Sequence, residues 1–258
     1  MISMERFRVP ISTASYQRVP RAANRWHRLT FAGNGALWLA VKRLRTHGPV
    51  ATGVFLAILA LGAAPDPYRD ASPSASPHFV APPNALFSDD FHDRSLKGWV
   101  PDRPGVWTVR HGMLRADLPD AKQLRGFLYA GSESWADYAV DLDVCQMRGV
   151  DKGVVVRVTR ERGVGVDLRG QGYQDVVMYR REWPMGKARV VNANGVWHHL
   201  RVEAHRSRYR VFVNGDLLID RNDQKNACPQ GRIALPAYTG GVGQCTLYYD
   251  NVVVTPLP

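Results

Sequence analysis

The stretch GVWHHLRVEAHRSRYRVFVNGDLLID, residues 195–220, decides the fold of this chain. Residues 199–204 within it alternate polar and apolar side chains, a pattern typical of a half-buried β-strand. Asn214 and Gly215 separate two further runs of this kind, and both residues tolerate the positive φ that a type I′ turn requires. The stretch therefore predicts consecutive antiparallel strands that are joined by tight turns.

The same pattern recurs on both sides of this stretch. Residues 153–159, 175–181 and 246–254 are short, β-branched or aromatic runs, and His111-Gly112 forms a turn between two others. We find no sustained 3.6-residue periodicity that would predict helices as the main scaffold. The sequence predicts an all-β domain over residues 86–258, folded as a two-sheet antiparallel jelly-roll sandwich.

The basic charge of the chain lies outside this predicted domain. The net charge is +11, but residues 1–48 hold nine Lys or Arg against one acid, whereas the remaining residues hold 25 against 22. Nucleic-acid binding needs basic side chains concentrated on the folded unit, where they neutralise phosphates. We therefore expect no nucleic-acid partner.

The region before the sandwich is typical of an exported protein. Residues 49–64 form an uncharged, largely apolar run of 16 residues, which is shorter than the roughly 20 residues of a membrane-spanning helix. This predicts a signal-peptide core, with an uncleaved membrane anchor as the alternative. We expect a secreted, periplasmic or cell-envelope location, with membrane contact only through an uncleaved segment.

The segments on either side of this apolar run have different compositions. Residues 1–48 are a basic extension that is long for a signal peptide, so a later translation start, for example at Val41, is a hypothesis. Residues 65–85 are rich in Pro, Ser and Ala, which predicts an extended, solvated linker.

The order of the strings LFSDDF, WTVRHGML, WADYAVDLDV, GVVVRV and LYYDNVVVTPL resembles the concanavalin A-like lectin/glucanase superfamily. Within it, the chain is most similar to bacterial laminin-G-like and 3-keto-disaccharide hydrolase-type domains. The resemblance covers about residues 86–257. It implies a jelly roll whose concave sheet faces a sugar.

The resemblance also implies a structural calcium ion that ties the first strand to the last. The matching positions are Asp90, Gly112 and Asp250, of which the two aspartates would supply side-chain oxygens. The alternative is that Asp90 and Asp250 cap strand ends or pair with arginine. Zinc is disfavoured, because the adjacent His198 and His199 would point to opposite faces of a strand.

The catalytic motif of the laminarinase-type relatives is not present in this sequence. These enzymes place E-x-D-x-x-E on one strand, whereas residues 141–146 here read DLDVCQ. Neither Cys145 nor Gln146 replaces a carboxylic acid as proton donor, which excludes that specific mechanism. We expect Asp141 and Asp143 on the polar face of a half-buried strand.

The 3-keto-disaccharide hydrolase resemblance implies a different site. Its strand motif matches residues 153–157, which end on Arg157, and the next strand has Gly165 and Asp167 where relatives carry Glu and Gln. Arg157 and Asp167 would then face one pocket and bind sugar hydroxyls, while Tyr179 or Trp183 stacks on a sugar ring. The alternative is an exposed Arg–Asp pair on a sheet surface. We interpret the surrounding string ERGVGVDLRG, residues 161–170, as a solvated face.

Three cysteines complete the candidate residues. Cys228 and Cys245 flank a predicted strand and, in an oxidising compartment, could form a disulfide. Cys145 would then remain as a free, buried thiol.

These observations lead to three hypotheses about function. The first is an exported carbohydrate-binding sandwich, stabilised by calcium. The second is a glycoside hydrolase or lyase of the 3-keto-disaccharide hydrolase type, and the third is a structural or adhesive module.

Overall fold

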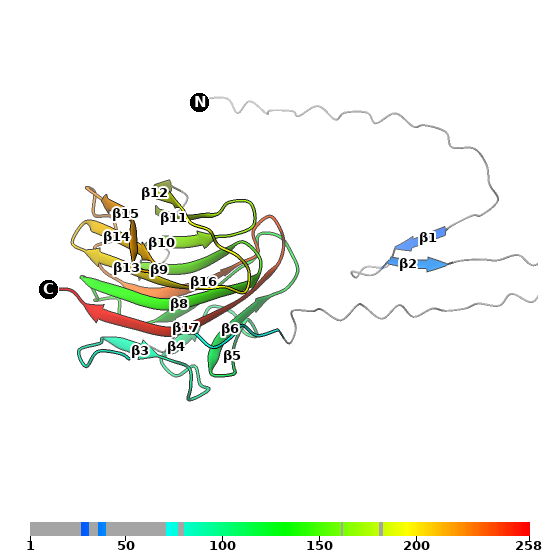
Figure 1. The fold of residues 1–258 in the computed structure, drawn as a ribbon, viewed down its shortest axis with the longest axis horizontal. Coiled ribbons are helices and arrows are strands. Elements are labelled where there is room, and N and C mark those ends of the chain that lie inside the picture. Colours follow the sequence, from blue (N-terminus) through cyan, green and yellow to red (C-terminus); the bar gives the residue numbers. More distant parts are fainter. Residues whose placement is uncertain (1–26, 31–35, 40–70, 77–79, 161, 181–182) are drawn as a thin grey trace, which may run out of the picture. The chain divides into compact units, whose positions relative to one another are not determined.

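The computed structural model describes residues 27–30, 36–39, 71–76, 80–160, 162–180 and 183–258 (Figure 1). The chain divides into two units, Met1–Pro65 and Asp66–Pro258. In the first unit, β1 (His27–Thr30) pairs with β2 (Ala36–Leu39) in an antiparallel hairpin. The predicted signal-peptide core at residues 49–64 lies outside the described residues. None of the described residues belongs to a helix long and apolar enough to cross a membrane.

The second unit consists of two antiparallel sheets. The eight-stranded sheet contains β3 (Phe87–Asp89), β5 (Trp107–Arg110), β6 (Met113–Leu118), β8 (Tyr138–Arg148), β13 (Trp197–His205), β14 (Arg208–Val213), β15 (Asp216–Asn222) and β17 (Cys245–Pro256). The seven-stranded sheet contains β4 (Trp99–Pro101), β7 (Arg125–Ala130), β9 (Asp151–Thr159), β10 (Arg162–Arg169), β11 (Asp175–Arg180), β12 (Trp183–Arg189) and β16 (Arg232–Tyr238). The predicted all-β jelly-roll sandwich is confirmed.

Alternating side chains of the two sheets form one hydrophobic core between them. Strands of the two sheets contact each other where β8 and β13 lie over β9 (Figure 1). The eight-stranded sheet contributes Leu114, Val140, Leu142, Val144, Leu200, Val202 and Leu247, and the seven-stranded sheet contributes Val154, Val156, Val164, Val166, Leu168 and Leu235. Because successive side chains of a strand point to opposite faces, the residues between these core positions face away from the core.

Tight turns join neighbouring strands, as the sequence predicts. Asn214 and Gly215 connect β14 to β15 with φ values of 53° and 90°. His111 and Gly112 connect β5 to β6 with φ values of 55° and 73°. Positive φ at both positions is the geometry of a type I′ hairpin turn.

Part of the predicted linker packs on the eight-stranded sheet. We name residues 71–76 the strap. Its Ala71 carbonyl accepts hydrogen bonds from Arg115 and from the Tyr248 hydroxyl, at 3.2 and 2.8 Å. The Ser74 carbonyl accepts a hydrogen bond of 2.7 Å from the Trp197 indole. The strap therefore contacts the sheet through its backbone carbonyls, while Ser72, Ser74 and Ala75 are exposed to solvent.

The expected disulfide between Cys228 and Cys245 is wrong. Both residues are free and buried, as is Cys145. Cys228 precedes β16 and Cys245 follows it, so a strand of seven residues, roughly 20 Å long, separates them. A disulfide requires Cα atoms within about 7 Å, and position on either side of a strand does not provide this proximity.

Candidate functional site

A groove of about 950 Å³ runs over the seven-stranded sheet, on the face that points away from the core. Its floor contains small side chains at neighbouring positions of three central strands, which are Val155 on β9, Gly165 on β10 and Ala234 on β16. Larger side chains of the outer strands form its walls, namely Arg125, Phe127 and Tyr129 on β7, Tyr179 on β11, and Pro184 and Lys187 on β12. The groove therefore results from the order of residue sizes across the sheet.

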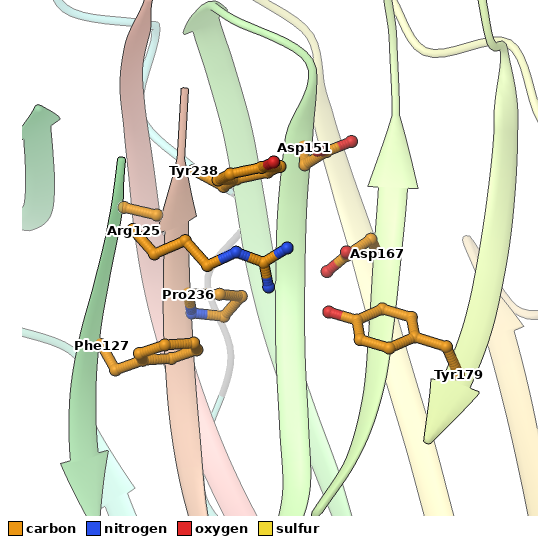
Figure 2. Close-up of a pocket in the computed structure, with 8 residues that line it drawn as sticks. Arg125, Phe127, Asp151, Asp167, Tyr179, Pro236 and Tyr238 are labelled. Carbon is orange, nitrogen blue, oxygen red and sulfur yellow. The ribbon is translucent and has the colours of Figure 1, made fainter. Parts of the chain in front are cut away.

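Strand register brings the polar side chains of the groove together. Arg125 lies opposite Tyr238, Tyr238 opposite Asp151, and Asp151 opposite Arg169, so these four form a row across β7, β16, β9 and β10. Asp167 precedes Arg169 by two residues, so it faces the same side and is a diagonal neighbour of Asp151. Figure 2 shows the guanidinium group of Arg125 pointing toward Asp167.

Gly165 allows Tyr179 to reach Asp167. The two residues lie opposite each other on β10 and β11. A Cβ atom at Gly165 would stand 2.4 Å from Cζ of the Tyr179 ring, so only glycine lets the ring lie across β10. The Tyr179 hydroxyl points at the Asp167 carboxylate (Figure 2), and this interaction opposes the rise in the pKa of Asp167. The ring of Tyr179 therefore occupies the space over Gly165.

Two carboxyl groups of the groove titrate near neutral pH. Burial raises the pKa of Asp167 to about 7, with a further increase from the negative charge of Asp151. Burial also raises the pKa of Asp151 to about 6, against the opposing effects of Arg169 and Arg125. Oδ1 of Asp151 is buried and has no hydrogen-bond partner in the described part of the chain. A carboxyl group that exists in both forms near neutral pH suits general acid–base chemistry.

Cationic side chains surround these carboxyl groups. Arg169 binds Asp175 with two hydrogen bonds of 2.7 and 2.9 Å, and Lys187 lies 2.9 Å from the same carboxylate. Arg125 packs its guanidinium over the Tyr238 ring, at 4.2 Å from the centroid. One acid, Asp175, thus neutralises only part of the charge of its two cationic partners.

The structure separates Arg157 from Asp167. Two residues of β9, Val156 and Arg157, oppose the single residue Ile233 of β16 at this point, and Arg157 has a φ of 54°. This β-bulge turns its side chain to the interior. The buried guanidinium donates hydrogen bonds to the carbonyls of Ala136, Arg206 and Cys228, to the Tyr209 hydroxyl and to the Asp137 carboxylate. Its expected place in the pocket is wrong, because strict alternation does not reveal a bulge.

The other two predicted sugar-binding residues have different positions. Tyr179 lines the groove beside Asp167. Trp183 begins β12 opposite Arg180, its side chain is 76% exposed, and it does not line the groove. Of the four predicted residues, the structure therefore brings together Asp167 and Tyr179.

Several residues of the site were not predicted from the sequence. They are Arg125, Asp151, Arg169 and Tyr238. A signal was present in β10, where glycine, glycine, aspartate and arginine alternate with apolar residues. The interpretation of this string as a solvated face is wrong for Arg169, whose side chain is only 22% exposed and lines the groove.

The three predicted calcium positions have other contacts. The buried Asp250 carboxylate accepts hydrogen bonds from the Ser76 hydroxyl at 2.6 Å and from the Asn251 backbone N–H at 2.8 Å. Asp90 is exposed, and Nδ1 of His92 lies 3.0 Å from its carbonyl oxygen. The His92 ring also lies against Gly112. A calcium ion at Asp90, Gly112 and Asp250 stays a prediction.

Other metal ligands give no alternative site. In the part of the chain that the structure describes, no three His, Cys, Asp or Glu side chains lie together as a metal-binding group.

Comparison with known proteins shows which chains share this sequence pattern and fold. A family profile described as "3-keto-alpha-glucoside-1,2-lyase-like domain" matches residues 85–255. No curated protein sequence matches the chain.

Solved structures share the sandwich at low identity. A carbohydrate-binding module, CBM66, from Bacillus subtilis is 16% identical, with a TM-score of 0.53 over 61% of this chain and 95% of that one. A protein of unknown function with a galectin-like fold, also from Bacillus subtilis, is 8% identical, with a TM-score of 0.56 over 67% and 96%. The Crh5 transglycosylase in complex with NAG is 14% identical, with a TM-score of 0.53 over 69% and 88%. These similarities show that the chain shares its fold with these proteins.

Proposed function

Because the chain belongs to the 3-keto-alpha-glucoside-1,2-lyase-like domain family, we propose that its groove binds a saccharide. The observation that carries the proposal is the arrangement of aromatic walls around a polar centre. Phe127 and Tyr129 stand on one side, Tyr179 stands on the other, and Asp167 lies between them. Aromatic rings pack on the apolar faces of sugars, while carboxyl and guanidinium groups bind hydroxyls.

Calorimetric titration of the full chain with α-linked gluco-oligosaccharides and their 3-keto forms tests this proposal. Arg125 lies at the polar centre, so Arg125→Gln is expected to weaken binding by about tenfold, which corresponds to about 1.4 kcal/mol. Arg208→Gln is the matched control, because Arg208 is exposed on the eight-stranded sheet and pairs with Asp220. Equal weakening by both variants, or no binding of any saccharide, would contradict the proposal.

A second candidate function is cleavage of a glycosidic bond by elimination, and the titration of Asp151 and Asp167 favours it. In a 3-keto-glucoside, the carbonyl at C3 acidifies the proton on C2. An ionised carboxylate removes this proton, and the electrons form an enolate whose charge lies on the C3 oxygen. The enolate then re-forms the carbonyl and expels the C1 oxygen substituent, which takes a proton from a neutral acid.

The groove contains groups for each of these steps. Asp167 and Asp151 have pKa values of about 7 and 6, so one ionised and one neutral carboxyl group coexist between these values. The guanidinium of Arg125 points into the same space, where it would stabilise an enolate oxygen (Figure 2). No water is consumed, so the products are an unsaturated ketone and an alcohol.

Ultraviolet absorbance of the unsaturated ketone measures this activity directly. Asp167→Asn removes a titrating carboxyl group, and we expect it to lower the rate by at least about 100-fold. Asp220→Asn serves as the control, because Asp220 is on the eight-stranded sheet and pairs with Arg208. Saccharide binding with no product in the wild type would limit the function to binding.

We also propose that the protein is exported from the cell that produces it. The uncharged apolar run at residues 49–64 supports it, since its length suits a signal-peptide core. N-terminal sequencing of the protein from the producing cells is expected to show cleavage near the end of this run. A mature chain that retains it would favour the membrane anchor.

A further inference from the structure

The groove is lined by more cationic than acidic side chains. Arg125, Arg160, Arg162, Arg169 and Lys187 line it, against Asp151 and Asp167. Burial also keeps these two carboxyl groups partly protonated near neutral pH. Outside the groove, the second unit has nearly equal numbers of basic and acidic side chains. The excess of positive charge is therefore confined to the groove.

Two of these cations stand apart from the carboxyl groups. Arg160 and Arg162 are exposed at the hairpin that joins β9 to β10, with Thr159 opposite Arg162. Within the described ranges, neither forms an ion pair with an acidic side chain. Glu161 and Glu182, the acids nearest to this end in the sequence, lie outside the described residues.

The distance along the strand separates two parts of the groove. Arg162 begins β10, and Asp167 follows it by five residues, so the two positions are roughly 16 Å apart along the strand. A ligand that contacts both ends must therefore extend beyond the sugar ring over Asp167. The glycines at positions 163 and 165 keep the floor between the two ends low.

We propose that the saccharide taken by this groove is an anionic oligosaccharide, with a carboxylate or sulfate group bound by Arg160 and Arg162. This inference rests on the proposed saccharide-binding function. A planar guanidinium binds carboxylate or sulfate oxygens with two parallel hydrogen bonds, and two such groups at one end provide a site for a negative charge. The neutral part of the ligand lies between the aromatic walls.

The test compares three α-linked gluco-oligosaccharides of equal length: a neutral one, one oxidised to the carboxylate at C6, and a sulfated one. We expect the full chain to bind a charged form at least about tenfold more tightly than the neutral form in calorimetry. Tighter binding of the carboxylated or of the sulfated oligosaccharide shows which anionic group the site prefers. Affinity for the charged form should fall with rising salt, whereas affinity for the neutral form should not.

A double variant, Arg160→Gln with Arg162→Gln, locates the charge-binding end. It is expected to remove the preference for the charged form and to leave neutral binding unchanged. The control is Arg208→Gln with Arg221→Gln on the eight-stranded sheet, where both arginines contact Asp220. Thermal unfolding of both variants verifies that they fold.

Each outcome separates this inference from the proposed function. Equal affinity of the wild type for charged and neutral forms would overturn the inference and leave saccharide binding intact. No binding of any of the three would overturn both. A single-stranded oligonucleotide that binds more tightly than the charged saccharides, and depends on Arg160 and Arg162, would overturn the inference in favour of a nucleic acid.

Discussion

At the residue scale, His199 shows how strand register sets the charge of a single side chain. β13 pairs with β8, so His199 lies opposite Asp143, and its Nδ1 and Nε2 lie 2.9 and 3.3 Å from the carboxylates of Asp143 and Asp141. Hydrogen bonds to these two groups raise the pKa of His199 to about 9. The adjacent His198 is buried on the other face, and burial lowers its pKa to about 4.

This arrangement predicts a stability that depends on pH. The pKa of His199 in the folded protein, about 9, exceeds the value of 6.5 expected in the unfolded chain. Protonated His199 therefore contributes its full share to the free energy of unfolding below pH 6.5, and this share is lost as the pH rises through 9. We expect the free energy of unfolding to fall by about 1 kcal/mol over this interval, a small value because the pair is partly exposed.

Chemical denaturation at several pH values measures this change. His199→Gln should flatten the profile between pH 6.5 and 9, because glutamine does not titrate. If the variant keeps the wild-type slope, the ion pairs of His199 do not cause it.

At the element scale, the strap ties the segment before the sandwich to the eight-stranded sheet. Besides the contacts of Ala71 and Ser74, its Ser76 hydroxyl donates to Asp250 and accepts from Asn251 at 3.0 Å. The strap thus covers polar side chains that face away from the core. The composition of this segment predicted an extended, solvated linker. Composition does not show which backbone carbonyls accept hydrogen bonds from a distant strand, so these contacts could not be predicted from it.

Deletion of residues 71–76 from the full chain tests this contact. We expect a loss of about 1 to 2 kcal/mol, because several hydrogen bonds of about 1 kcal/mol each are offset by the entropy of the released segment. Hydrogen exchange of the Trp197 indole, measured by NMR, should become faster. The Trp99 indole donates to Asp89 at 2.7 Å and provides the internal control. Unchanged exchange at Trp197 would show that the strap does not cover it.

At the scale of the whole molecule, local sequence patterns predicted the fold better than the site. Alternation and turn chemistry identify strands wherever one face is buried, as in β8, where the core residues Leu142 and Val144 alternate with the outward-facing Asp141 and Asp143. The matching family profile and the two-sheet structure confirm the resemblance and the fold.

The site was harder to predict because it depends on pairing between distant strands. Asp151, Arg125 and Tyr238 meet only because β9 and β7 both pair with β16. The bulge at Arg157 shifts the alternation within a strand, which no local pattern reveals. Asp167 was predicted from the family resemblance, and Tyr179 was predicted as an aromatic ring that stacks on a sugar; periodicity pointed to neither residue.

The cysteines give a prediction for the molecule as a whole. All three are free and buried, and burial raises the pKa of Cys245 to about 12 and that of Cys145 to about 11. We therefore expect the melting temperature to stay within about 1 °C when a thiol reductant is added, because no cross-link is lost. A decrease of several degrees would demonstrate a disulfide and contradict the arrangement of β16 between Cys228 and Cys245.

Hydrogen–deuterium exchange of the full chain, with and without a bound oligosaccharide, tests the central claim most directly. If the groove of the seven-stranded sheet is the saccharide site, the ligand should slow exchange in β7, β10 and β11, around Arg125, Asp167 and Tyr179. Exchange in β13 and β14 of the eight-stranded sheet should stay unchanged. Protection confined to β13 and β14, with none in β10, would contradict the account.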